Sequence, residues 1–262
     1  MPISNEKKIK LSVKGAGKRY QDLQALSDCS LDVAESTIVS IVGPSGCGKT
    51  TLLWSMSGLH ELSEGNIALD GIPIHGPHPD IGLVFQEANL LPWRNLLRNI
   101  HFPFEVKKET PDQAWIEHLL DRVKLRGFEA RFPRELSGGM QQRASIVRAL
   151  SQRPSVLLMD EPFGALDAFT REEMNRLVEE IWLETRTTIV FITHSIEEAL
   201  FLSDRVVVMS GRPGRVLNEY EVPFPRPRTM DVMASKDAYD LTYQIKADIY
   251  GGHAVDQKNA AE

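Results

Sequence analysis

The chain has 262 residues, of which 42% are apolar and 25% are charged, and its formal net charge is −6. This composition is typical of a globular protein and excludes collagen-like, coiled-coil and disordered classes. The acidic balance gives no overall positive field for nucleic acid, and the first residues lack the apolar core of a signal peptide. Nowhere do about 18 apolar residues follow one another, as a membrane span requires, so we expect a cytoplasmic protein.

The first part of the chain, residues 9–74, consists of short alternating apolar and polar segments with turn signals between them. Asp70 and Gly71 separate segments 66–69 and 72–74, and this dipeptide favours a tight antiparallel hairpin. Residues 38–42 form a largely apolar run that precedes a glycine-rich loop and a helix-compatible stretch, 50–59. We therefore predict an antiparallel region that also contains a strand, loop and helix in succession.

Helical patterns dominate residues 87–153. Apolar residues recur at helical spacing over 116–123, and we expect Thr110 to be the N-cap of that helix, with Pro111 in its first turn. A second helix is predicted to begin at Ser137. This stretch lacks apolar strands, which indicates a helical lobe.

Short strands then alternate with helices. Apolar runs at 156–159, 188–192 and 206–209 are separated by an amphipathic pattern around 174–181, which indicates a parallel sheet covered on both faces. From residue 223 prolines break the pattern, and the polar tail holds one helix candidate, 239–249. We predict one α/β domain over 1–222, with a core of about 1–86 and 154–222 and an inserted helical lobe of about 87–153, followed by a tail, 223–262.

The glycine-rich loop carries the strongest signal for chemistry. Its sequence matches G-x-x-x-x-G-K-[ST] between a predicted strand and a predicted helix, which is the context of a phosphate-binding P-loop. Backbone N–H groups and the helix N-terminus would surround phosphate oxygens, Lys49 would reach the β- and γ-phosphates of ATP, and Thr50 would hold Mg²⁺. The predicted nucleotide-binding residues here are Gly43, Pro44, Ser45, Gly46, Cys47, Gly48, Lys49, Thr50 and Thr51. Cys47 and Cys29, the only cysteines, are predicted to be free thiols, because a disulfide would lock this loop.

A pair of carboxylates ends the apolar run 156–159. P-loop enzymes hold Mg²⁺ at such a strand end, so Asp160 is predicted to contact the metal shell. Glu161 points differently, and could accept a proton from an attacking water as general base. A solvated acidic turn before Pro162 is the alternative when this pair is considered alone.

Residues 136–143, Leu-Ser-Gly-Gly-Met-Gln-Gln-Arg, resemble the signature motif of ABC ATPases, about twenty residues before the acidic strand end. The resemblance implies a P-loop NTPase (RecA-like) core with an antiparallel β subdomain and an inserted α-helical subdomain. It also implies that Ser137, Gly138, Gly139 and Gln141 contact an ATP held by a partner subunit, so that a second ATPase subunit completes each site.

Further elements follow in the order of this family. Gln86 resembles the Q-loop glutamine that senses Mg²⁺ and water, and His194 resembles the switch histidine at the γ-phosphate. Asp167 lies in a segment similar to the D-loop, although Gly164 stands where a serine is common. Tyr20 is assigned by position only to the aromatic that stacks on adenine, and a core or surface tyrosine is nearly as good an interpretation.

Three segments resemble the nitrate, sulfonate and taurine importer group: 85–100, which includes Gln86, Trp93 and Asn99; 161–168; and 211–215. This similarity implies a cytoplasmic, peripheral subunit at the inner (plasma) membrane that energises membrane permease subunits and is served indirectly by an extracytoplasmic solute-binding protein. Apolar residues 90–93 would suit permease docking, or Trp93 would pack within the lobe. The alternative is a non-transport ABC ATPase acting on nucleic acid or the ribosome, but only fifty residues separate Gln86 from Leu136, which leaves no room for a long coiled-coil insertion, and we expect no nucleic-acid partner.

Overall fold

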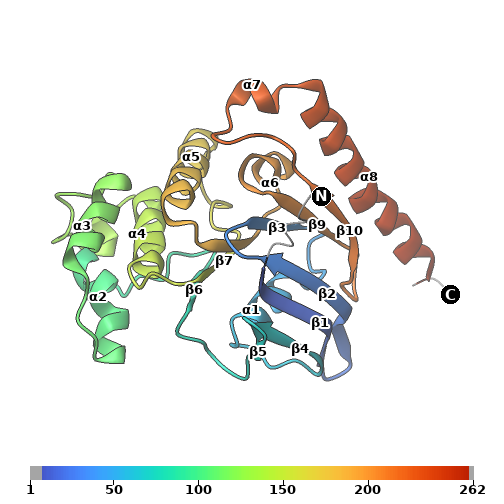
Figure 1. Cartoon of the computed structure of the whole chain (residues 1–262), viewed down its shortest axis with the longest axis horizontal. Helices are drawn as coiled ribbons and strands as arrows, with labels where there is room; N and C mark the ends of the chain where they lie inside the picture. Colours follow the sequence, from blue (N-terminus) through green and yellow to red (C-terminus); the bar gives the residue numbers. More distant parts are fainter. Residues whose placement is uncertain (1–7, 260–262) are drawn as a thin grey trace, which may run out of the picture.

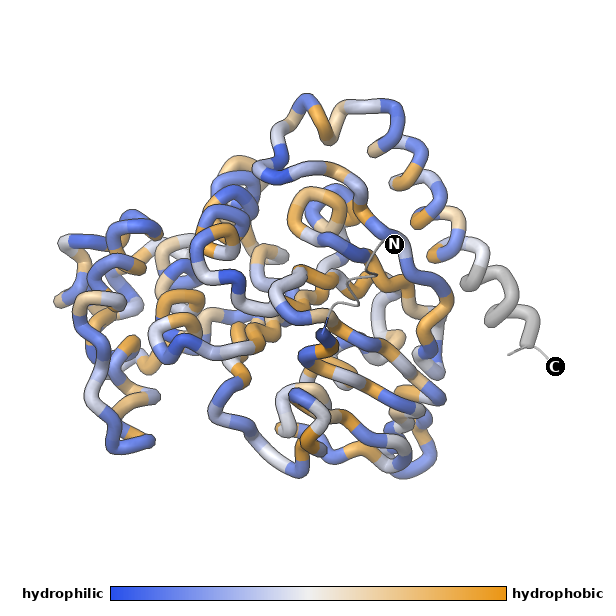
Figure 2. The backbone as a smooth tube through the Cα atoms, in the orientation of Figure 1, coloured by the Kyte–Doolittle hydropathy of each residue, from blue (hydrophilic) through white to orange (hydrophobic). Residues whose placement is uncertain are grey.

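A six-stranded sheet lies at the centre of the molecule, a computed structural model that describes residues 8–259, with only the backbone described from residue 252 onward. Five strands are parallel and β10, at one edge, runs antiparallel to β9. In spatial order the strands are β10 (Val216–Glu221), β9 (Arg205–Met209), β3 (Ile38–Val42), β8 (Thr188–Ile192), β7 (Val156–Asp160) and β6 (Ile81–Val84). The predicted parallel sheet is therefore confirmed, and Figure 2 shows hydrophobic stretches gathered along its strands.

The second sheet is antiparallel and has four strands, in the order β2 (Leu23–Ala34), β1 (Ile9–Tyr20), β4 (Glu64–Leu69) and β5 (Ile72–Pro73). The predicted hairpin is present, because Leu69 pairs with Ile72 across a two-residue turn. Asp70 and Gly71 both adopt positive φ, 48° and 80°, as the tight hairpin turn requires. Figure 1 shows this sheet beside the central one.

Alternate residues of each central strand face two different hydrophobic cores. Val156 and Leu158 belong to the core shared with the antiparallel sheet and helix α1 (Lys49–Met56), which lies between the sheets. Leu157 and Met159 belong to the core formed with α5 (Ala168–Thr185) and the helical lobe. Because neighbouring strand residues point to opposite faces, one short apolar run serves both cores.

The helical lobe contains α2 (Leu96–Lys107), α3 (Gln113–Arg122), the 3₁₀ turn η1 (Pro133–Glu135) and α4 (Gly138–Leu150). The predicted start of α4 after Ser137 is confirmed, but the predicted N-cap of α3 is wrong. Asp112, rather than Thr110, caps α3 by accepting a hydrogen bond from the Trp115 N–H at 3.0 Å. The carboxylate of Asp112, two residues after Thr110, therefore caps the helix in place of the threonine. Pro111 lies outside the helix.

Three helices lie near strands β9 and β10. They are α6 (Ile196–Leu202), which packs on β3 and β9, α7 (Met230–Met233), which contacts α6 and α8, and α8 (Lys236–Asn259), which descends along β10 (Figure 1). Helix α8 extends well beyond the predicted 239–249, and within the predicted range Ile245 and Ile249 pack against α6, β9 and β10. The preceding segment is held by Arg228, which is 4% exposed and donates to the carbonyls of Leu200, Phe201 and Ser203.

Candidate active site

The P-loop joins β3 to α1 and is shaped by its glycines and its lysine. Gly48 caps α1 with φ 104°, and a Cβ there would lie 2.8 Å from the Ala25 carbonyl oxygen. The Lys49 Nζ donates to the carbonyl oxygens of Gly43 at 3.0 Å and Pro44 at 2.8 Å, and the residue is 5% exposed. The loop therefore already holds its cation inside a ring of backbone groups, as a phosphate cradle requires.

A cavity of about 330 Å³ opens at this loop. Its lining brings together predicted site residues from four separate parts of the chain with three residues, Leu23, Ala25 and Arg212, that were not predicted. The lining residues are Tyr20, Leu23, Ala25, Ser45, Gly46, Gly48, Lys49, Thr50, Thr51, Glu161, His194 and Arg212. Cys47 lies beneath the cradle instead, 1% exposed, and burial raises the pKa of its thiol. Both cysteines are free, as predicted.

Asp160 contacts Thr50, which lines the cavity. The Thr50 hydroxyl donates to the Asp160 carboxylate at 3.1 Å, and Asp160 is 6% exposed. Burial raises the pKa of Asp160, with repulsion from Glu161 adding to it. A buried carboxylate beside a hydroxyl, with its charge poorly compensated, is a donor set that suits Mg²⁺. The residues present therefore fit the predicted metal.

Glu161 lies one residue beyond β7 in a strained backbone conformation with φ 44°. Its carboxylate oxygen lies 2.6 Å from Nε2 of His194, which follows β8. Both residues also line a second cavity of about 340 Å³, to which Gln86 contributes from the end of β6. The structure thus brings three residues predicted from separate motifs together at the carboxyl ends of three neighbouring strands.

The chain matches a known family. The family described as "ABC transporter" matches residues 26–164 of the chain. The chain belongs to the ABC transporter family. A protein named "Taurine import ATP-binding protein TauB" from Jannaschia sp. (strain CCS1) is 49% identical over 221 residues, which cover 82% of each chain. "Aliphatic sulfonates import ATP-binding protein SsuB" from Bacillus licheniformis is 41% identical, over 86% of this chain and 88% of that protein.

Solved structures show the same fold. The dimeric ATP-binding cassette MJ0796, described in a post-hydrolysis state bound to ADP and Pi, matches with a TM-score of 0.72 and 31% identity, covering 82% of this chain and 100% of that one. The predicted family, fold and activity are confirmed: the protein is an ABC ATPase with a P-loop NTPase core, and it binds and hydrolyses ATP.

The signature residues of this ABC ATPase lie outside both cavities. Ser137 accepts a hydrogen bond from the Met140 N–H at the start of α4, and Gly138 and Gly139 follow it at the helix N-terminus. Gln141 turns toward its own chain, since its amide donates to the carbonyls of Pro133 and Leu136. Neither Ser137 nor the two glycines line the P-loop cavity of the same chain.

Asp167 caps α5 of the ABC ATPase. Its carboxylate accepts hydrogen bonds from the hydroxyl of Thr170 at 2.7 Å and from the Thr170 N–H at 3.0 Å, and these bonds lower its pKa. A Cβ at Gly139 would lie 3.0 Å from the Thr170 side chain. The D-loop and the signature helix therefore adjoin one another within one subunit, and both remain exposed.

Tyr20 lies at the rim of the cavity and is 37% exposed. Its hydroxyl is 2.8 Å from Nδ1 of His60, and the two rings meet edge to face with centroids 6.0 Å apart. His60, which was not predicted from the sequence, therefore sets the position of the Tyr20 ring at the mouth of the cavity.

Two further residues beside Glu161 were missed from the sequence. Glu198 and Arg171 line the second cavity. Glu198 is 5% exposed and accepts a hydrogen bond from the Thr193 hydroxyl, and burial raises its pKa to about 6. Arg171 donates to the carbonyls of Phe163 and Leu166, which flank Gly164. Both lie on helices, and only their contacts reveal them.

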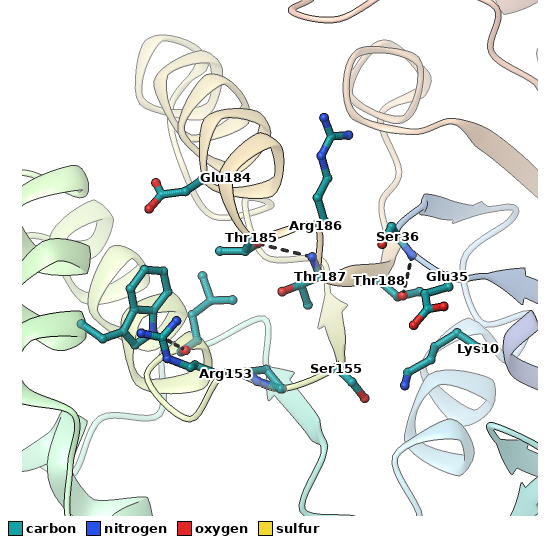
Figure 3. Close-up of a pocket in the computed structure, with 13 residues that line it drawn as sticks. Lys10, Glu35, Ser36, Arg153, Ser155, Glu184, Thr185, Arg186, Thr187 and Thr188 are labelled. Atoms are coloured by element: carbon teal, nitrogen blue, oxygen red, sulfur yellow. Dashed lines mark hydrogen bonds between the residues drawn. The ribbon is translucent and has the colours of Figure 1, made fainter. Parts of the chain in front are cut away.

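A separate cavity of about 370 Å³ lies at the amino ends of β7 and β8 (Figure 3). Lys10 and Arg153 line it but are paired elsewhere, with Asp70 at 2.5 Å and Asp112 at 3.0 Å respectively. None of the predicted site residues lines this cavity. The chemistry of the ABC ATPase is therefore concentrated at the opposite, carboxyl ends of the strands.

Proposed function

We infer that this ABC ATPase is the energising subunit of a membrane importer for taurine or a related sulfonate. The observation that carries the catalytic part is the 2.6 Å contact of Glu161 with His194 between two cavities, one of them walled by the P-loop. The solute class follows from the relatives named for taurine and aliphatic sulfonate import. It fits the similarity of segments 85–100, 161–168 and 211–215 to that importer group.

The residues divide the work of hydrolysis as follows. Lys49 and the P-loop amides bind the β- and γ-phosphates, and Thr50 and Asp160 would hold Mg²⁺, which supplies positive charge against the phosphates when bound. Glu161 accepts a proton from the attacking water, and His194, whose Nε2 lies 2.6 Å from that carboxylate, orients it and contacts the γ-phosphate. Gln86 orients the water from the far side of the second cavity.

One subunit does not complete this site. The described signature residues lie outside both cavities, so their exposed helix N-terminus is free to face the γ-phosphate of ATP bound to a second subunit. The dimeric cassette with 31% identity supports this assembly, for which a second copy of the chain is the simplest partner. Two MgATP molecules would then lie between the P-loop of one subunit and the signature motif of the other.

The surface near Gln86 is the proposed contact with the permease. Trp93 is 71% exposed, so it does not pack inside the lobe, and it stands beside Leu91 and Pro92 on a loop fixed by α2. Over the residues that the structure describes, no helix has the length and apolarity to cross a membrane. Contact with the membrane would thus be made through permease subunits, on their cytoplasmic side. We propose the same division of the chain as above, with the core at about 1–86 and 154–222 and the lobe at about 87–153.

ATP-driven uptake by proteoliposomes tests this function. The chain is reconstituted with its permease and solute-binding protein, and uptake of radiolabelled taurine is measured with MgATP inside. We expect uptake with the wild type and none with Lys49→Ala, because loss of the charge-assisted bonds of Lys49 weakens nucleotide binding by roughly ten- to a hundredfold. ATP hydrolysis without uptake of taurine or any aliphatic sulfonate would contradict the assignment of solute.

A further inference from the structure

The loop between β9 and β10 packs directly against the P-loop. Gly214 lies so close that a Cβ there would be 2.1 Å from the Cys47 carbonyl oxygen. Its N–H donates to the Ala25 carbonyl at 2.9 Å, and its carbonyl accepts from the Ser27 N–H at 3.0 Å. The loop is therefore fixed between β2 and the phosphate cradle, 165 or more residues away in the chain from both.

Arg212 extends from this loop to the mouth of the nucleotide cavity. Its Nε and Nη2 both donate to the Gly46 carbonyl oxygen, at 3.2 and 2.9 Å. Gly46 has φ 74° and belongs to the P-loop, and a Cβ on it would meet Arg212 Nη2 at 3.2 Å. One guanidinium edge thus holds the outer side of the cradle, and the same side chain lines the cavity with Tyr20 and Lys49.

The charge of Arg212 is available to a ligand. Among the described residues, its Nη1 makes no hydrogen bond and its guanidinium makes no ion pair with a carboxylate. The other cation that lines the cavity, Lys49, already donates to Gly43 and Pro44. Bound ATP brings several negative charges to a cavity whose only lining carboxylate is Glu161. A free guanidinium edge with fixed geometry suits phosphate oxygens better than any other group of the nucleotide.

We propose that Arg212 is a nucleotide-binding residue that contacts the polyphosphate of ATP from outside the sequence motifs. This inference rests on the proposed nucleotide site and adds to it a residue that neither the P-loop nor the signature motif contains. It also assigns a role to the Gly-Arg-Pro-Gly-Arg stretch at 211–215: Gly214 permits the close approach, and Arg212 supplies the charge.

Binding measurements on the full chain test the proposal. Titration of a fluorescent ATP analogue with Arg212→Ala should give affinity about tenfold weaker than with the wild type, the effect of one charge-assisted hydrogen bond. Arg212→Gln retains a donor for the Gly46 carbonyl but has no charge, and should be nearly as weak. The wild-type affinity should fall more steeply with added KCl than that of either variant. Arg215→Ala, on the same loop but outside the cavity lining, is the matched control and should bind like the wild type.

The outcomes separate this inference from the proposed function. Wild-type affinity in Arg212→Gln would overturn it, because the residue would then only support the loop, and so would a loss shared equally by Arg215→Ala. Affinity within twofold of wild type for Arg212→Ala would also overturn it. Failure of the wild type itself to bind ATP would instead contradict the nucleotide site as a whole. Thermal melting of the nucleotide-free variants checks that each is folded. If Arg212→Ala is not folded, the comparison with the wild type is made with Arg212→Gln.

Discussion

Glu198 illustrates at the scale of single residues how the fold sets a charge. It is 5% exposed, and one of its carboxylate oxygens has no hydrogen-bond partner among the described residues. Burial raises its pKa from an ordinary value of 4.5 to about 6, against a hydrogen bond from Thr193 that lowers it. The folded protein therefore holds this proton more tightly than the unfolded chain does. Stability contributed by the protonated carboxyl is present below about pH 4.5 and is lost as the pH rises through about 6.

We predict that the free energy of unfolding of Glu198→Gln, relative to that of the wild type, rises by about 1 kcal/mol as the pH is raised from 5 to 8. The amide is neutral at both pH values and can still accept the bond from Thr193, so only the ionisation cost is removed. Urea unfolding at the two pH values measures the difference. Glu197→Gln, on the exposed side of the same helix, is the control, and a stability difference for Glu198→Gln that does not change with pH would contradict the account.

Motif residues could be predicted from the sequence because each type has little structural use at its position. Lys49 in a glycine loop and Asp160 at a strand end are examples: Lys49 lines the cavity, and Asp160 accepts a hydrogen bond from Thr50, which also lines it. Gln141 stays a predicted contact to the nucleotide of a second subunit, and within its own chain its amide donates to two carbonyls. Glu198 belongs to no recognised motif, and the segment 211–215 indicated no chemical role for Arg212, so only their neighbours identify the two residues.

At the scale of elements, the segment that follows Gln86 is held by a single buried asparagine. The Asn99 side chain accepts from the Leu91 N–H at 2.7 Å and donates to the carbonyls of Leu91, Arg94 and Asn95. It is fully buried. Arg148 of α4 adds bonds to the carbonyls of Ala88 and Asn89. The exposed Trp93 is thus presented by a rigid loop tied to two helices.

We predict that Asn99→Ala lowers the free energy of unfolding by about 2–3 kcal/mol, because it leaves several buried backbone groups unpaired. Amide hydrogen exchange over residues 88–95 should become faster than in the wild type, while exchange in β7 stays slow. Denaturant unfolding and exchange mass spectrometry measure the two effects. Asn66→Ala, at an exposed strand position, is the matched substitution, and an equal loss there would show that the effect does not come from this loop.

Strands β3, β7, β8 and β9 were predictable to within one residue, because short apolar runs with turns on both sides have few alternatives. The bounds of β1, β2 and β10 were not predicted. The ends of the helices could not be predicted as closely. The start of α3 depends on whether Thr110 or Asp112 reaches the free N–H groups, which the sequence leaves open. The predicted helix 239–249 covers the residues of α8 that pack against α6 and β10, but α8 begins earlier and ends later, at Lys236 and Asn259.

At the scale of the whole molecule, the central sheet lies between the P-loop and antiparallel sheet on one face and the helical lobe on the other. One face carries α1, the P-loop and the antiparallel sheet, and the other carries α5 and the helical lobe with the signature helix α4. Glu161, His194 and Gln86 lie where these halves meet, at the carboxyl ends of the strands. In the proposed mechanism, a displacement of the lobe would reach the proposed catalytic residues through Gln86 and the loop that follows it. In the proposed dimer, completion of the site by a second subunit would link hydrolysis to association.

The most direct test of the proposed mechanism compares Glu161→Gln with the wild type. ATP hydrolysis is measured, and light scattering gives the molecular mass in solution with and without MgATP. The amide cannot accept a proton, so turnover should fall by about a hundredfold or more, while ATP binding is retained. Trapped ATP should then hold two subunits together, giving a dimer that appears only with MgATP. Hydrolysis by Glu161→Gln at the wild-type rate, or a variant that binds ATP and stays monomeric, would contradict the central claim.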